Sequence, residues 1–164
     1  MGKGTIYHYF DSKEELFVEV TEKEVASLRQ KLVDALEGAD GPEEKIKAYI
    51  KARCRMIAEI AGLFSLFKQE YMQYYSYIRK VQDKFLDFER GCLEGNIREA
   101  VSKGLFRECD VEFTAYSIGR AMHAMEYYFG TSVKAEDMEK KASEFAGLFL
   151  DGVRKRQESS VARG

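Results

Sequence analysis

The sequence has few of the residues that build metal sites, disulfide frameworks or turns. Its 164 residues include two histidines, His8 and His123, three cysteines and a single proline. The histidines lie far apart, without acids or cysteines at metal-ligand spacing, so we expect no zinc site. The cysteines (Cys54, Cys92 and Cys109) are odd in number and lack a Cys-x-x-Cys pair, which favours reduced, core-packed thiols in a cytosolic protein.

Several sequence signatures of membrane proteins and enzymes are also missing. No run of about eighteen apolar residues is present and no signal-peptide pattern opens the chain, so the cytoplasm is the expected location. There is no phosphate-cradling glycine loop and no nucleophile elbow. The paired acids Glu14-Glu15 and Glu43-Glu44 stand where helices are expected to begin and fit capping acids better than a catalytic pair. We therefore expect no enzymatic activity and no cofactor, with a helical enzyme as the least favoured alternative.

The composition indicates a helical protein with one core. Hydrophobic residues make up 45% and charged residues 33% of the chain, with 13 glycines. This balance, with so little proline, favours an all-α, multi-helix bundle over a β or disordered chain. The formal net charge of -2 does not mark a strongly basic nucleic-acid binder.

Apolar residues recur at three- to four-residue spacing over most of the chain and predict a series of helices. Ser12, with Glu15 three residues later, and Asp110 are expected N-caps, and Pro42 suits a first helical position. Gly62 is expected to interrupt a helix and Gly104 to end one in a Schellman motif. The expected helices cover residues 13–38, 42–61, 78–102, 111–129 and 135–155, and a dense apolar segment covers 63–77.

The opening of the chain concentrates groups that hold phosphate. A lysine, glycine amides at a helix start, and threonine, tyrosine and histidine donors can together position a protein on a DNA duplex. The same residues resemble the recognition helix and the start of the next helix in the TetR (tetracycline repressor) family of transcriptional regulators: Lys3-Gly4-Thr5-Ile6-Tyr7-His8-Tyr9-Phe10, followed by Ser12-Lys13-Glu14-Glu15-Leu16. The rest of the chain resembles the family in its helical layout.

The resemblance implies a ligand-responsive regulator, expected to be a repressor, that binds operator DNA as a homodimer. Residues 1–12 would be a remnant of the DNA-binding domain, 13–38 the linking helix, 39–156 the ligand-binding and dimerisation domain, and 157–164 a flexible tail. The residues expected to contact DNA are Lys3, Gly4, Thr5, Tyr7, His8 and Lys13.

The family places its recognition helix third, whereas here Met1 directly precedes it. A helix-turn-helix needs its first helix to brace the second in the groove. We therefore expect the chain to lack the first two helices, and operator DNA to be a partner if those helices are present. A shortened chain, a wrongly chosen start codon and a natural fragment all remain open. Two alternatives follow: a ligand-binding and dimerisation module that does not bind DNA, or a plain amphipathic opening with Ile6, Tyr9 and Phe10 buried.

The resemblance also implies a pocket for a small, apolar or aromatic effector. The predicted pocket residues are Phe64, Phe67, Tyr71, Tyr74, Phe85, Tyr116, His123 and Tyr127, for which ordinary core packing is the alternative. His123 is the polar candidate among them, because a neutral imidazole can donate or accept a hydrogen bond. The last two helices of each subunit would form a four-helix dimer interface through Gly119, Met122, Phe145, Leu148 and Phe149.

Overall fold

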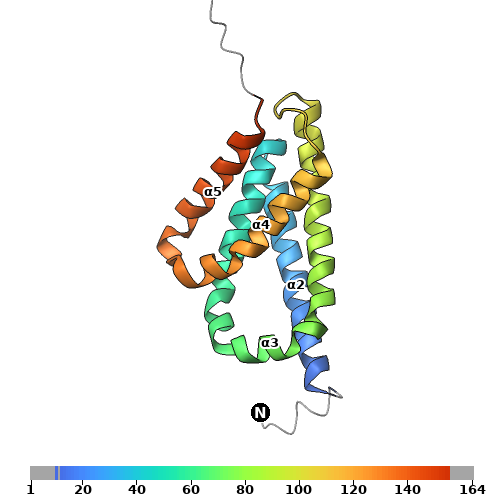
Figure 1. Ribbon diagram of the computed structural model, residues 1–164, viewed down its shortest axis with the longest axis vertical. Helices are drawn as coiled ribbons and strands as arrows, with labels where there is room; N and C mark the ends of the chain where they lie inside the picture. Colours follow the sequence, from blue (N-terminus) through green and yellow to red (C-terminus); the bar gives the residue numbers. More distant parts are fainter. Residues whose placement is uncertain (1–9, 11, 156–164) are drawn as a thin grey trace, which may run out of the picture.

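The computed structural model describes residues 10 and 12–155, with the side chains of 58, 60–75, 77, 78, 126, 127, 129–131 and 135 left aside. The described residues form helices α2 (Lys13–Glu37), α3 (Pro42–Ser102), α4 (Val111–Ser132) and α5 (Met138–Val153), with a 3-10 turn η1 (Ala135–Asp137) before α5. The extended pairing within this range is a single bridge between Phe106 and Arg154. The predicted all-α class is therefore confirmed (Figure 1).

The long helix α3 turns back on itself. Its first arm (residues 42–60) descends, a segment near residue 70 crosses at one end of the molecule, and its second arm (residues 76–102) returns beside the first (Figure 1). Side chains of the two arms meet where the Tyr49 hydroxyl donates to Glu89 over 3.0 Å. The predicted interruption at Gly62 is wrong, because helical structure continues through this residue while the helix axis changes direction.

The helix ends follow the predicted capping signals. The Ser12 side chain accepts from the Glu15 amide over 3.1 Å, and Asp110 accepts from the Phe113 amide over 3.0 Å. After α3, Gly104 adopts a φ of 69°. The Leu105 amide bonds to the Ala100 carbonyl and the Gly104 amide to the Val101 carbonyl, both over 2.9 Å, which is the Schellman pattern. The α4 helix continues to Ser132, three residues beyond the predicted end.

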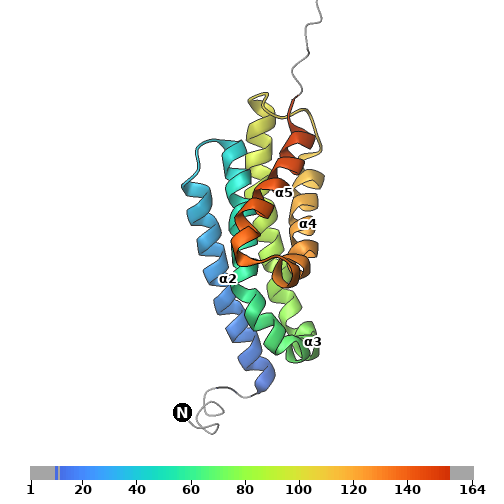
Figure 2. The ribbon, with the colours of Figure 1, turned by 90° about the vertical axis from the view of Figure 1, so that its left-hand side faces the viewer.

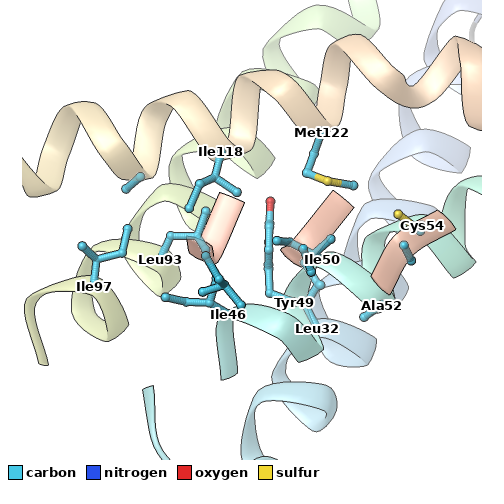
Figure 3. Packing of buried hydrophobic residues seen from close by; sticks show 14 of the residues in the cluster. Leu32, Ile46, Tyr49, Ile50, Ala52, Cys54, Leu93, Ile97, Ile118 and Met122 are labelled. Atoms are coloured by element: carbon cyan, nitrogen blue, oxygen red, sulfur yellow. The ribbon is translucent and has the colours of Figure 1, made fainter. Parts of the chain in front are cut away.

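One hydrophobic core joins the helices. Helix α4 crosses both arms of α3, α5 lies beside the first arm, and α2 contributes the buried Leu32 (Figures 1 and 2). The fully buried aliphatic residues at its centre include Ile46, Ile50, Leu93, Ile97 and Ile118, and several of them surround the ring of Tyr49 in Figure 3. Within the described residues no helix combines the length and apolar character needed to cross a membrane.

Candidate functional site

The predicted DNA-contacting end of the chain meets the described structure at the start of α2. Lys3, Gly4, Thr5, Tyr7 and His8 lie outside the described residues. Lys13 is the first residue of α2 and its side chain is exposed, directly after the Ser12 cap. The described structure therefore begins where the segment predicted to contact DNA passes into the linking helix.

Among the described side chains, those of the C-terminal half of α2 pack against the hydrophobic core. Leu32 is 1% exposed, and four partly buried residues of the same half pack on the core: Val25, Leu28, Ala35 and Leu36. In the N-terminal half Val20 is 50% exposed.

Two cationic side chains of α2 reach different arms of α3. The Arg29 Nη2 donates to the Lys84 carbonyl of the second arm over 2.9 Å, and the guanidinium lies 5.1 Å from the centre of the Phe88 ring. The Lys31 Nζ lies 2.5 Å from a Glu59 carboxylate oxygen of the first arm. Both arms thus contact the helix that leads toward the predicted DNA end (Figure 2).

The core contains a buried polar cluster of Tyr49, Arg53 and Glu89. The Arg53 Nε lies 2.6 Å from Glu89 Oε1, which also accepts the Tyr49 hydroxyl over 3.0 Å. The side chains of Arg53 and Glu89 are 3% and 0% exposed. Burying two charges is costly unless each is paired and hydrogen-bonded, so this cluster is a conspicuous polar feature in an apolar interior.

Burial changes the acid-base behaviour of groups beside this cluster. The pKa of the Tyr49 hydroxyl is raised well above its usual value of 10.0, chiefly by burial and then by the Glu89 charge. Burial also raises the pKa of the Cys54 thiol to about 11. Both groups therefore stay protonated at neutral pH, and Tyr49 acts as a hydrogen-bond donor.

Our sequence prediction did not assign Arg53 or Glu89 to a site. A signal was present, because each charged residue sits within an apolar helical stripe: Arg53 follows Tyr49 by four residues, and Glu89 stands four residues after Phe85. Such a position also suits a long side chain that reaches solvent from the edge of the stripe. The packing of the second arm of α3 against the first decides whether such a side chain is buried or reaches solvent.

The predicted pocket residues fall into three groups. The side chains of Phe64, Phe67, Tyr71, Tyr74 and Tyr127 lie outside the described ones, although all five belong to α3 or α4. Phe85 is 6% exposed and packs in the core, and His123 is half-buried on α4. Tyr116 is 52% exposed, so within the single chain it faces outward and not into an interior chamber.

A surface hollow lies beside Tyr116, between the second arm of α3 and α4. Four of the eight lining residues are charged, and Gly119 and Ala115 are small. The lining residues are Asp83, Leu86, Asp87, Arg90, Ala115, Tyr116, Gly119 and Arg120. Because half of its lining residues are charged, this hollow differs from the predominantly apolar site expected for the predicted effector.

The outer faces of α4 and α5 expose large apolar side chains. Leu148 is 78% exposed, and α4 exposes Phe113 (67%), Tyr116 and Tyr128. Phe145 and Phe149 are half-buried and pack against the core from α5, and a Cβ atom added at Gly119 would meet nothing within 4 Å. This surface can therefore receive another helix.

The placement of Met122 in the predicted dimer interface is wrong. Its side chain is fully buried at 0% exposure, and in Figure 3 it points from α4 into the core near Tyr49. Helix α4 has apolar residues on more than one face, so its sequence did not distinguish the inward from the outward face. Packing against α3 made this choice and left Met122 no surface for a partner.

Comparison with known proteins connects this arrangement to bacterial regulators. Residues 1–20 match the family model of bacterial regulatory proteins, tetR family. The chain is 26% identical over 126 residues to YhgD, an HTH-type transcriptional regulator of Bacillus subtilis (strain 168). That alignment covers 71% of this chain and 61% of YhgD, so the chain spans less than two thirds of the length of this relative.

Solved structures of bacterial regulators are similar to this chain over nearly its whole length. The TetR family transcriptional regulator PfmR from Thermus thermophilus superposes with a TM-score of 0.74 at 26% identity, covering 94% of this chain and 84% of PfmR. A Clostridium perfringens protein described as a fatty acid metabolism regulator superposes with a TM-score of 0.72 at 27% identity, covering 95% and 84% of the two chains. The helical layout is therefore shared well beyond the twenty residues that match the family model.

Proposed function

Because this chain belongs to the TetR family of bacterial regulatory proteins, we propose that it acts as a ligand-responsive repressor that binds operator DNA as a homodimer. The observation that carries the proposal is the continuity of the chain. Residues matching the family model run directly into α2, and α2 packs against both arms of α3. The family consists of transcriptional regulators, in agreement with our expectation that the chain is not an enzyme.

The DNA-binding step is assigned to Lys3, Gly4, Thr5, Tyr7, His8 and Lys13. Fluorescence anisotropy with promoter-region DNA, measured at increasing salt concentration, tests this assignment. Each lost phosphate contact lowers the slope of log affinity against log salt concentration by about one. Lys13→Ala is expected to weaken binding and reduce this slope. Lys23→Ala removes a matched exposed lysine of the same helix, paired with Glu19 over 2.8 Å, and is expected to change neither.

If neither this chain nor one extended upstream of Met1 binds DNA specifically while both remain folded and dimeric, the repressor assignment fails. The chain would then be a ligand-binding and dimerisation module. Repeating the titration with DNA of unrelated sequence distinguishes specific binding from the salt-dependent, sequence-independent background.

Dimerisation is assigned to the outer faces of α4 and α5. Leu148, the most exposed of the large apolar side chains described, supports this choice, because burying it in a two-fold interface removes its apolar surface from water. Leu148→Glu is expected to give a folded monomer in sedimentation velocity. Val20→Glu changes an exposed apolar residue of α2 and is expected to leave the dimer intact. A dimer that persists in Leu148→Glu would contradict this interface.

The effector is proposed to be a small, largely apolar molecule bound inside the helical domain. The Clostridium perfringens protein described as a fatty acid metabolism regulator makes a long-chain fatty acid the first probe to test. His123→Ala is expected to lower the affinity for palmitate, measured by calorimetry, while dimer stability stays unchanged. Unchanged palmitate affinity would remove His123 from the proposed site, and absence of binding by the native chain would remove fatty acids as the effector.

A further inference from the structure

We propose that Arg29, Phe88, Phe85 and Arg53 form a four-residue stack that couples the buried polar cluster in the core to the linking helix α2. The contacts run in order from α2, through the second arm of α3, to the first arm. The part that this stack plays in regulation depends on the function proposed above, whereas the mechanical coupling can be measured without DNA or effector.

The outer end of the stack fixes α2 to the second arm of α3. Arg29 donates to the Lys84 carbonyl over 2.9 Å, and its guanidinium lies 5.1 Å from the Phe88 ring centre. A planar guanidinium that stacks on a ring while donating in its plane has little freedom to turn. A change in the angle of α2 at this position must therefore either break these contacts or move the Phe88 ring.

The inner end ties the same ring to the buried polar cluster. The rings of Phe88 and Phe85 are 6.3 Å apart between centres and 24° from parallel. The Arg53 guanidinium lies 5.3 Å from the Phe85 ring centre, and Arg53 is paired with Glu89 over 2.6 Å. A shift of Arg53 or Glu89 therefore changes the support of Phe85, and through it the position of Phe88.

The other charged contact of α2 is a weaker candidate for this coupling. Lys31 and Glu59 are 48% and 61% exposed, and exposed ion pairs contribute little because water and salt screen them. Arg53, Glu89 and Phe85 are buried, where the packed interior transmits displacement with little compliance. Lys31 lies two residues from Arg29 and thus provides a matched control.

Hydrogen exchange read by mass spectrometry tests the stack from its inner end. The double variant R53M/E89Q removes the buried charges together and leaves Tyr49 an acceptor at position 89. Amides of α2 over residues 25–36 are expected to exchange about threefold faster or more, the range of coupling seen between interacting sites. With Phe88→Leu already present, the same double change is expected to add less than about twofold. Ile118→Val, a core change on α4, controls for a general loss of stability.

The test can also be run from the outer end, because coupling between two sites is reciprocal. Arg29→Met keeps much of the side-chain volume and is expected to speed exchange of amides over residues 49–57 by a similar factor. Lys31→Met is expected to leave them unchanged. This arm remains informative if R53M/E89Q does not fold.

The stack is overturned as the route of coupling if R53M/E89Q speeds exchange over residues 25–36 equally in the native background and with Phe88→Leu present. It is also overturned if Arg29→Met and Lys31→Met change exchange over residues 49–57 equally. Neither result depends on DNA or palmitate binding, so a failure here is distinguishable from a failure of the proposed repressor function.

Discussion

Breaking the buried ion pair from one side is expected to damage the protein far more than removing both charges. Arg53 and Glu89 are 2.6 Å apart and almost fully buried. At an effective dielectric constant of about 20, two unit charges at this distance attract by about 6 kcal/mol before desolvation is counted. Desolvation of the two ions costs several kcal/mol each and cancels most of that attraction.

Arg53→Met alone leaves a buried carboxylate without its guanidinium. We expect a loss of about 3–5 kcal/mol in the free energy of unfolding, as for other buried pairs broken from one side. The double variant R53M/E89Q leaves no such charge and is expected to fall within about 1 kcal/mol of the native chain or above it. Tyr49→Phe removes one hydrogen bond to Glu89 and is expected to cost about 1.5–3 kcal/mol, since the acceptor is charged.

Urea unfolding followed by circular dichroism at 222 nm measures all three variants at one fixed protein concentration, which removes the effect of dimer formation on apparent stability. The reasoning is refuted if the double variant is as unstable as Arg53→Met. It is also refuted if Arg53→Met costs less than about 1 kcal/mol, because the pair would then not be desolvated as its burial indicates.

Three further predictions concern the helix stop, acid stability and thiol reactivity. Gly104→Ala is expected to cost about 1–2 kcal/mol in urea unfolding, because a φ of 69° brings the added Cβ close to the following carbonyl; no loss would contradict the Schellman geometry. The pKa of Glu139 is lowered below its usual 4.5, mainly by the hydrogen bond from Arg55 and to a smaller extent by the one from Lys51. The stability this gives is complete above about pH 4.5 and is lost as the pH falls through the folded-state value, so Glu139→Gln should show a smaller drop in urea midpoint between pH 6 and pH 3 than the native chain. An equal drop in both would show that the contact adds nothing in solution. Burial raises the pKa of Cys54 to about 11. In the variant Cys92→Ser/Cys109→Ser at pH 8, Cys54 should therefore react with a thiol reagent at least about tenfold more slowly in the folded than in the unfolded protein. Similar rates in the two states would mean that Cys54 is accessible.

Local signals in the sequence were reliable where one residue acts on its own neighbours. The Ser12 and Asp110 caps, Pro42 at the first position of α3 and the Gly104 stop are all confirmed. Each depends on hydrogen bonds or dihedral angles within a few residues, so the local sequence contains the needed information. Core packing was also confirmed for Cys54, which lies on the apolar stripe of the first arm.

The prediction of residue roles was weaker wherever two helices had to meet. Met122 was expected at a dimer interface and is instead fully buried, while Tyr116 was expected in a pocket and is half exposed. On an amphipathic helix the pattern shows that a face is buried, but not whether its own chain or a partner buries it. Gly62 gave a similar error, because a glycine that can end a helix can also remain inside one that bends.

The sequence by itself determined the all-α class, the caps at Ser12 and Asp110, the Gly104 stop and the similarity of residues 1–20 to bacterial regulatory proteins of the tetR family. The tertiary structure alone decided that α3 folds back, that Arg53 meets Glu89 across its two arms, and that Arg29 reaches Phe88 from α2. The physical reason is the range of the interactions. Caps and apolar stripes act over a few residues, whereas a buried ion pair and a stack of rings exist once segments about 35 to 60 residues apart have packed together.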